Sequence, residues 1–412
     1  MRIVEAVFPA RLGTGFRWLI GSSWLSNLGD GITLAAGPLL VASLTDDARL
    51  VALAATVQWL PPLLFALLAG ALSDRLDRRR IVIVTNLVRV VVLGVLTAAL
   101  FTDRVGITAV LAALFLLGTA EVFADNAAQT LLPMVVRRED LLIGNARLQA
   151  GFVTLNQLAG PPLGALLFTA GRAWPFASQV VLLALAVVLV GRITLGPHPR
   201  AGEPRPKLRH DIAEGFRWAL GHPAVRTLIL TIFIFNLTFG AAWSVLVLYT
   251  TQRLGLGELG FGLVTTVQAA GGLLGIAAYG WITRHVSLAG VMRIGLILET
   301  FTHLGLALTR HAAVALPIFF LFGAHAFVWG TTSVTIRQRV VPLHLQGRVN
   351  SVNLVGVFGG LVIGSVVGGL LAERWGVTAP FWYAFVGSAV FVVAIWRQLA
   401  HISRADAAPQ SD

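Results

Sequence analysis

The loop Gly70-Ala71-Leu72-Ser73-Asp74-Arg75-Leu76-Asp77-Arg78-Arg79-Arg80 joins two apolar runs, near residues 50–73 and 81–102. A helix needs roughly 20 apolar residues to cross the ~30 Å hydrocarbon core of a bilayer, and each run is long enough. Short basic loops between such runs are typical of the cytoplasmic side of membrane proteins. A loop that only stops translocation does not need its two aspartates, so the pattern predicts a further role for them.

The composition agrees with a membrane protein. The chain has 412 residues, of which 56% are hydrophobic and 12% charged, and its mean hydropathy is +0.80. A soluble domain of this size cannot bury so much apolar side chain. The formal charge of +12 resides in short loops between apolar runs, which argues against nucleic acid as a partner. There is no cysteine and the nine histidines are scattered, so we expect no metal and no cofactor.

Twelve apolar runs fall into two groups of six, separated by a polar stretch that contains several prolines. They lie near residues 17–45, 50–73, 81–102, 106–133, 146–170, 173–195, 225–250, 260–283, 288–309, 313–336, 351–372 and 378–398. The sequence therefore predicts an all-α membrane protein with twelve transmembrane helices in two six-helix bundles.

The two groups of runs look like copies of one another. Asn145, Gly151 and Gly164 match Asn350, Gly356 and Gly369 at one constant shift. Such internal repeats are a hallmark of transporter folds, with the substrate site between the repeats. We expect an N-terminal bundle (1–195), a cytoplasmic linker (196–224), a C-terminal bundle (225–398) and a cytoplasmic tail (399–412). Residues 208–220 of the linker predict an amphipathic helix on the membrane surface.

The basic residues predict the orientation. With both termini in the cytoplasm, the outer loops hold only Arg49, Arg104, Arg172, Arg253, Arg310 and Arg374, and Arg89 lies within a span. All other basic residues then fall on the inner side, as the positive-inside rule requires.

The loop quoted above closely resembles the loop 2–3 signature of the major facilitator superfamily, a glycine, a leucine two residues on, then Asp-Arg and a basic cluster. The resemblance implies a conformational gate formed by Gly70, Asp74, Arg75 and Arg78. Gly70 would let helices two and eleven approach closely. Asp74 would face the N-terminal end of helix eleven, whose dipole favours an anion. Asp77 departs from the pattern, because many members have glycine there.

A second motif lies in the fifth run. Gly160-Pro161-Pro162-Leu163-Gly164-Ala165 resembles the antiporter motif Gly-Pro-x-x-Gly-Gly, with Ala165 in place of the last glycine. The motif residues Gly160, Pro161 and Gly164 favour efflux by antiport. The alternative is a proline kink with small residues for helix packing.

The linker residues Asp211-Ile212-Ala213-Glu214-Gly215-Phe216-Arg217 are similar to those of the drug:proton antiporters that include macrolide efflux proteins and enterobactin exporters. This resemblance implies a monomeric, proton-coupled exporter of amphiphilic small molecules, such as antibiotics or siderophores, in a bacterial plasma membrane. The alternative is a lipid or lysophospholipid flippase of the same fold. We expect no enzyme, because no phosphate-binding loop, metal cluster or nucleophile elbow is present.

Ionisable residues within spans are functional candidates by default, because their burial in lipid is costly. In the family that the chain resembles, helices one, four, seven and ten line the cavity. Asp30 on helix one and Glu121 on helix four lie at similar depth, and Asp125 lies one turn from Glu121. We expect these three carboxylates to bind the coupling proton, with Arg89 as an ion-pair partner of Asp125. A structural hydrogen bond to a neighbouring helix is the alternative for each.

The same family likeness predicts the substrate cavity. Its expected lining residues are Asn27, Asn236, Trp243, His325 and Trp329. For His325 a hydrogen-bonded core position is the alternative. Glu299 and His303, one turn apart on helix nine, are expected to satisfy each other.

Overall fold

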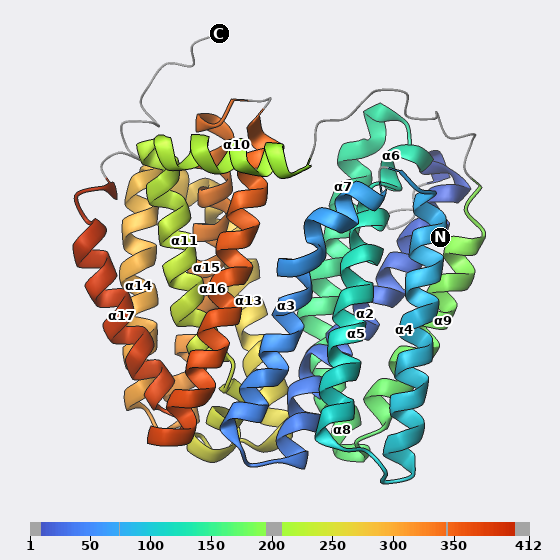
Figure 1. The fold of residues 1–412 in the computed structure, drawn as a ribbon, viewed down its shortest axis with the longest axis horizontal. Coiled ribbons are helices and arrows are strands. Elements are labelled where there is room, and N and C mark those ends of the chain that lie inside the picture. Colours follow the sequence, from blue (N-terminus) through green and yellow to red (C-terminus); the bar gives the residue numbers. More distant parts are fainter. Residues whose placement is uncertain (1–9, 74, 195–207, 343–344, 400–412) are drawn as a thin grey trace. The chain divides into compact units, whose positions relative to one another are not determined.

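The computed structural model describes residues 10–73, 75–194, 208–342 and 345–399, and all regular structure in these ranges is helical (Figure 1). Ten of the described helices are long and apolar enough to cross a membrane. They are α2 (Gly13–Leu44), α3 (Ala48–Ser73), α4 (Arg78–Phe101), α5 (Ile107–Gln129), α9 (Trp174–Gly191), α11 (Pro223–Trp243), α13 (Gly257–His285), α14 (Leu288–Leu308), α15 (Ala312–Val340) and α16 (Gln346–Trp375).

Two of the twelve predicted spans differ from these ten helices. The fifth is divided into α7 (Leu141–Gly151), a π-helix η3 (Phe152–Ala159) and α8 (Gly160–Ala170). Pro161 and Pro162 follow the π-helix after one residue, Gly160, and lack backbone N–H donors, which explains the break. The twelfth corresponds to α17 (Ala379–Ile395), a shorter apolar helix.

Short elements connect the long helices. They are η1 (Ala10–Leu12), α6 (Leu132–Val135), η2 (Arg138–Asp140), α10 (Leu208–Gly221), α12 (Leu246–Leu248) and η4 (Tyr249–Arg253). The last two extend the predicted seventh run beyond α11.

The chain forms two compact units. Unit 1 comprises Met1–Asp46, Val57–Glu203 and Gly257–Thr266, and unit 2 comprises Asp47–Thr56, Pro204–Leu256 and Val267–Asp412. Each unit therefore includes a short segment of the other predicted bundle: Gly257–Thr266 groups with unit 1 and Asp47–Thr56 with unit 2. Within the second unit, Arg49 forms an ion pair with Glu373 at 2.9 Å. The predicted tail beyond residue 399 and linker residues 196–207 lie outside the described residues.

Unit 1 is held together by close packing of α2 on α8 and α9, and of α4 on α5 and α9. Gly31, Gly160 and Gly164 bring the backbones of α2 and α8 together. A Cβ at Gly160 would lie 2.5 Å from the Cα of Gly31, and one at Gly164 would overlap the carbonyl oxygen of Ile32. Only glycine fits at such a contact, so these residues fix the wall that α2 and α8 share.

Unit 2 repeats this arrangement with α11 and α16. Gly360, Gly364 and Gly368 of α16 lie against the backbone of α11, where added Cβ atoms would overlap it. A close backbone contact made by glycines therefore occurs in both units. The sequence analysis matched Gly164 with Gly369, but Gly369 does not lie against α11; it faces Ala52 and Arg49.

The helix α10 covers the predicted amphipathic stretch and packs on the start of α16. Gly215 lies against the backbone of Arg348, and Glu214 accepts a hydrogen bond from Arg348 Nη1 at 2.6 Å. Phe216 and Leu220 remain exposed. The helix thus has one face on α16 and an apolar side left open, as a surface helix at a membrane would have.

Candidate functional site

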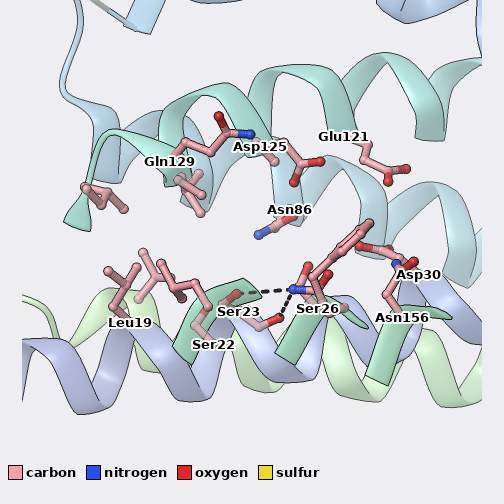
Figure 2. Close-up of a pocket in the computed structure, with 18 of the residues that line it drawn as sticks. Leu19, Ser22, Ser23, Ser26, Asp30, Asn86, Glu121, Asp125, Gln129 and Asn156 are labelled. Carbon is pink, nitrogen blue, oxygen red and sulfur yellow. Dashed lines mark hydrogen bonds between the residues drawn. The ribbon is translucent and has the colours of Figure 1, made fainter. Parts of the chain in front are cut away.

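A pocket of about 610 Å³ lies within unit 1, between α2, α4, α5 and the α7–η3 segment. Its lining is unusually polar for a membrane protein. Three acids face it, Asp30, Glu121 and Asp125, together with Ser22, Ser23, Ser26, Asn27, Asn86, Gln129, Asn145, Gln149 and Asn156. Figure 2 shows Glu121, Asp125 and Gln129 on one side of the pocket and Ser22, Ser23 and Ser26 on the other.

Helical spacing explains why these side chains meet. Ser22, Ser26 and Asp30 follow one another at intervals of four residues on α2, so they share one face. Glu121, Asp125 and Gln129 do the same on α5. Each helix therefore presents a polar stripe within an otherwise apolar sequence, and the pocket lies between the two stripes.

Asp30 and Arg89 form a buried ion pair at the edge of this pocket. Arg89 Nη2 donates to Asp30 Oδ1, and Arg89 Nη1 donates to Asn86 Oδ1 at 3.2 Å. Gln179 on α9 also donates to Asp30 Oδ1, at 3.0 Å. The side chain of Arg89 is only 1% exposed, so its charge depends on Asp30 for compensation.

The predicted ion pair between Arg89 and Asp125 is wrong. Asp125 is exposed and faces the open pocket, whereas the guanidinium is buried beside Asp30. A hydrogen bond from Gln179 supports the carboxylate of Asp30 at that position. The second carboxylate near Arg89 is Glu121, with Oε2 at 3.9 Å from Nη2.

The three acids carry more negative charge than the single positive charge of Arg89 can balance, and Glu121 and Asp125 are the two that face the pocket. The side chain of Glu121 is 41% exposed, and Asp125 lies one helical turn away on the same face. Among the residues that the structure places in the pocket lining, none is basic. Two carboxylates in this arrangement can bind protons or a cationic group, because either would relieve their mutual repulsion.

The predicted gate residues Asp74, Arg75 and Arg78 differ in how the structure describes them and in what they contact. Asp74 lies outside the described residues, and Arg75 is exposed. Arg78 Nε donates to the carbonyl of Ser73 at 3.2 Å, and its Nη1 donates to that of Thr130 at 3.4 Å. It thus fastens the loop to the end of α5.

The approach of helix two to helix eleven that the resemblance implied at Gly70 stays a prediction. A Cβ there would meet Asn126 Oδ1 only at 4.0 Å, an ordinary contact. Asp77, which departs from the family pattern, has a local role that capping rules could have predicted. Its side chain accepts a hydrogen bond from the backbone N–H of Arg80 and caps the start of α4.

The antiporter-motif residues Gly160, Pro161 and Gly164 are all buried where α8 packs on α2. This contact agrees with the packing alternative for the motif. A role in the exchange reaction itself stays a prediction.

The cavity residues predicted from the second half lie in unit 2 and are not in the lining of this pocket. Asn236 donates to the carbonyl of Ile232 on its own helix. Trp243 stacks on Phe239 at a ring distance of 4.5 Å, within a group of aromatic side chains. Nothing in these contacts tests substrate binding at Asn236, Trp243, His325 or Trp329, so their part in a cavity stays a prediction. Of the five predicted cavity residues, Asn27 does line the pocket.

Sequence reasoning missed three polar partners, Gln179, Asn86 and Asn156. A signal was present for each, because each is a polar residue inside an apolar run. Gln179 is fully inside the sixth run, and a buried amide there needs a partner on another helix. The predicted cavity used only helices one, four, seven and ten, which excluded these positions.

The comparisons with known proteins agree with this architecture. The profile of the transmembrane secretion effectors, a family of the major facilitator type, matches residues 6–412. The chain belongs to this family. It is a multi-pass membrane transporter, and its similarity to bacterial efflux proteins indicates the plasma membrane.

Two curated relatives of this transporter are efflux proteins. The multidrug efflux pump Tap of Mycolicibacterium fortuitum is 31% identical over 379 residues, which cover 86% of this chain and 88% of Tap. The enterobactin exporter EntS of Shigella boydii is 25% identical over 370 residues, covering 86% of this chain and 85% of EntS.

Solved structures show the same fold. A bacterial homologue of the iron transporter ferroportin matches with a TM-score of 0.76 at 16% identity, over 93% of this chain and 98% of that one. The nucleoside transporter NupG matches with a TM-score of 0.73 at 12% identity, over 94% of this chain and 99% of that one. At these identities the likeness establishes the fold alone.

Proposed function

We propose that this transporter is a proton-coupled antiporter that exports amphiphilic small molecules by alternating access. The observation that carries the proposal is the imbalance of charge in the unit 1 pocket. Asp30 is neutralised by Arg89, whereas Glu121 and Asp125 face the pocket without a basic lining residue among those described. Transport of organic compounds is also what the names of Tap and EntS describe for those relatives.

Competition for the two carboxylates that face the pocket, Glu121 and Asp125, provides the exchange. When the pocket faces the cytoplasm, a cationic substrate displaces protons from Glu121 and Asp125. When it faces outward, protons displace the substrate. Because one pair of carboxylates binds either partner, protons and substrate move in opposite directions. The polar lining adds hydrogen bonds that orient a substrate with hydroxyl or amide groups.

The same chemistry predicts the substrate class. An excess of carboxylates attracts compounds that carry an amine or a guanidinium and disfavours anions. Antibiotics with basic groups therefore fit the pocket better than acidic siderophores do. The flippase alternative is weaker, because the acyl chains of a lipid would find few apolar partners among these serines, asparagines and acids.

We further propose the topology that this cycle needs. α7, η3 and α8 together would form the fifth span and α17 the twelfth, which gives twelve spans. Both termini and the linker 196–224 would be cytoplasmic. The two bundles would be residues 1–195 and 225–398, and the working unit would be a monomer that contacts substrate, protons and lipid.

Transport by the purified protein in liposomes tests the proposal. A panel of cationic, neutral and anionic compounds is offered with and without a pH gradient, and accumulation is measured. We expect cationic compounds to accumulate only with the gradient, and a protonophore to abolish that accumulation. Equal accumulation without a gradient would contradict proton coupling. Rapid translocation of a labelled lysophospholipid, with no drug transport, would favour the flippase.

A further inference from the structure

Unit 2 contains a buried acid–base cluster that the proposed exchange does not use. Glu299 and His303 lie one turn apart on α14, and His325 reaches them from α15. Glu299 Oε2 lies 3.0 Å from His325 Nε2, and Oε1 lies 3.3 Å from His303 Nε2. None of these side chains is more than 10% exposed.

The hydrogen bonds of His325 fix where its proton lies. His325 Nδ1 is 2.9 Å from the backbone carbonyl oxygen of Phe322. A carbonyl oxygen only accepts, so Nδ1 carries the hydrogen. In a neutral imidazole the other nitrogen, Nε2, then has only a lone pair. That lone pair faces Glu299 Oε2 at 3.0 Å, and a carboxylate oxygen also only accepts.

Two acceptors at this distance need a proton between them. Either His325 is an imidazolium beside a carboxylate, or Glu299 is a carboxylic acid that donates to a neutral His325. In both forms the cluster holds one more proton than a carboxylate with two neutral imidazoles. In both forms its net charge is zero, which avoids an isolated charge in an apolar interior.

Within the described residues, the ion-pair partners of Glu299 are these two histidines and no arginine, so no other cation replaces that proton. From α11, Trp243 contacts the ring of His303 edge-on, at 5.9 Å. From α17, Tyr383 is the only ionisable side chain. Elsewhere near the two helices, Arg293 lies over the ring of Trp396, and Arg253 donates to the carbonyl of Thr309. The remaining ionisable groups of α15 are His311 just before its start, and Arg337 and Arg339 in its last turn.

His303 gives the cluster a second place for a proton. Its ring is fully buried, yet neither ring nitrogen has a hydrogen-bond partner. Since Nε2 lies 3.3 Å from Glu299 Oε1, a proton held by Glu299 can pass to His303 with a small movement of either side chain.

We propose that Glu299, His303 and His325 form a second proton-binding site, separate from Asp30, Glu121 and Asp125, so that each unit carries one. The step is a reversible proton transfer, in which an N–H or O–H bond forms in the cluster as a hydronium ion loses its proton. Binding of the proton stands on the geometry alone. Its use in coupling rests on the proposed function.

Spectroscopy of the full-length protein in lipid tests the binding. Histidine labelled with 15N is observed by solid-state NMR at about pH 8, where an exposed histidine with a pKa of about 6.5 is neutral. We expect either an imidazolium signal or, by infrared difference against Glu299→Gln, a protonated carboxylic acid. Glu299→Gln should remove either signal, because it takes away the acid itself or the carboxylate that compensates the imidazolium, whereas the exposed His285→Gln should leave the signal unchanged. If the wild-type protein shows neither signal, the proposal is wrong.

The ratio of protons to substrate tests the role in coupling. In liposomes, Glu299→Gln should lower the number of protons moved per substrate by about half, while His285→Gln should not. An unchanged ratio would exclude the cluster from coupling. Failure of the wild-type protein to respond to any pH gradient would instead overturn the proposed function, and the spectroscopic result would still stand.

Discussion

At the residue scale, the feature that organises the pocket is the pairing of Arg89 with Asp30. The two side chains come from α4 and α2, and the charge of Arg89 is almost wholly buried. Gln179 and Asn86 complete the hydrogen bonds of the pair. Because of this pairing, Asp30 holds the guanidinium at the edge of the pocket, whereas Glu121 and Asp125 face the pocket.

Asp30→Asn should therefore destabilise the protein much more than Asp125→Asn does. Removing one partner of a buried ion pair leaves an uncompensated charge and costs about 3–5 kcal/mol. Glu121, at 3.9 Å from Arg89, will reduce this loss in part. Unfolding in detergent, followed by the fluorescence of the eleven tryptophans, measures the difference. The double variant Asp30→Asn with Arg89→Gln should recover part of the stability. Equal stability of the two single variants would contradict the assignment.

Sequence reasoning identified the three acids of the pocket and the nearby Arg89 but not how these residues pair. Depth along a helix follows from residue counting, and this placed Asp30, Glu121 and Asp125 at comparable levels. The partner of Arg89 depends on helix rotation and on side-chain conformation, which counting does not give. Gln179, which donates a hydrogen bond to Asp30, lies on a helix that the family likeness had left outside the cavity.

At the element scale, α2 and α8 meet in a backbone contact next to η3, whose residues Phe152 and Asn156 line the pocket. Gly31, Gly160 and Gly164 allow the two backbones to touch. The sequence predicted a fifth span but not the π-helix η3 within it. Proline removes a backbone N–H donor at a known position, but it does not determine how the helix rearranges around the missing hydrogen bond. Asn156 lies within this π-helix and lines the pocket.

Gly164→Ala should lower both stability and transport. Its methyl group would overlap the carbonyl oxygen of Ile32, and overpacking of this kind costs about 1–3 kcal/mol. Gly94→Ala on α4 is the matched control, because a Cβ there meets nothing within 4 Å. Thermal unfolding and transport are measured for both. If Gly164→Ala behaved like Gly94→Ala, the contact between α2 and α8 would not be limiting.

At the scale of the whole molecule, the two units use the same packing device in corresponding helices, α2 with α8 and α11 with α16. Composition and run lengths were enough to predict a helical membrane protein with two related halves. They could not show that Asp47–Thr56 and Gly257–Thr266 group with the opposite halves, because that depends on contacts between distant segments.

The distribution of basic residues predicts that both termini are cytoplasmic. Reporter fusions at Asp103 and Arg310, in the loops after α4 and α14, should then report an outside location. A fusion within 196–207 should report inside. The positive-inside bias is the physical reason for the prediction. Inside signals at both Asp103 and Arg310 would reverse the orientation.

The central claim is that carboxylates of the unit 1 pocket couple protons to export, and one comparison in liposomes tests it most directly. Uptake driven by a pH gradient and downhill exchange of the same substrate are measured for the wild type, Glu121→Gln and Asp30→Asn. We predict that Glu121→Gln abolishes the driven uptake and retains downhill exchange, because substrate can still bind while its competition with protons at the carboxylate pair of the unit 1 pocket is lost. Asp30→Asn should weaken both. Pumping by both variants against a gradient, with wild-type pH dependence, would contradict the account.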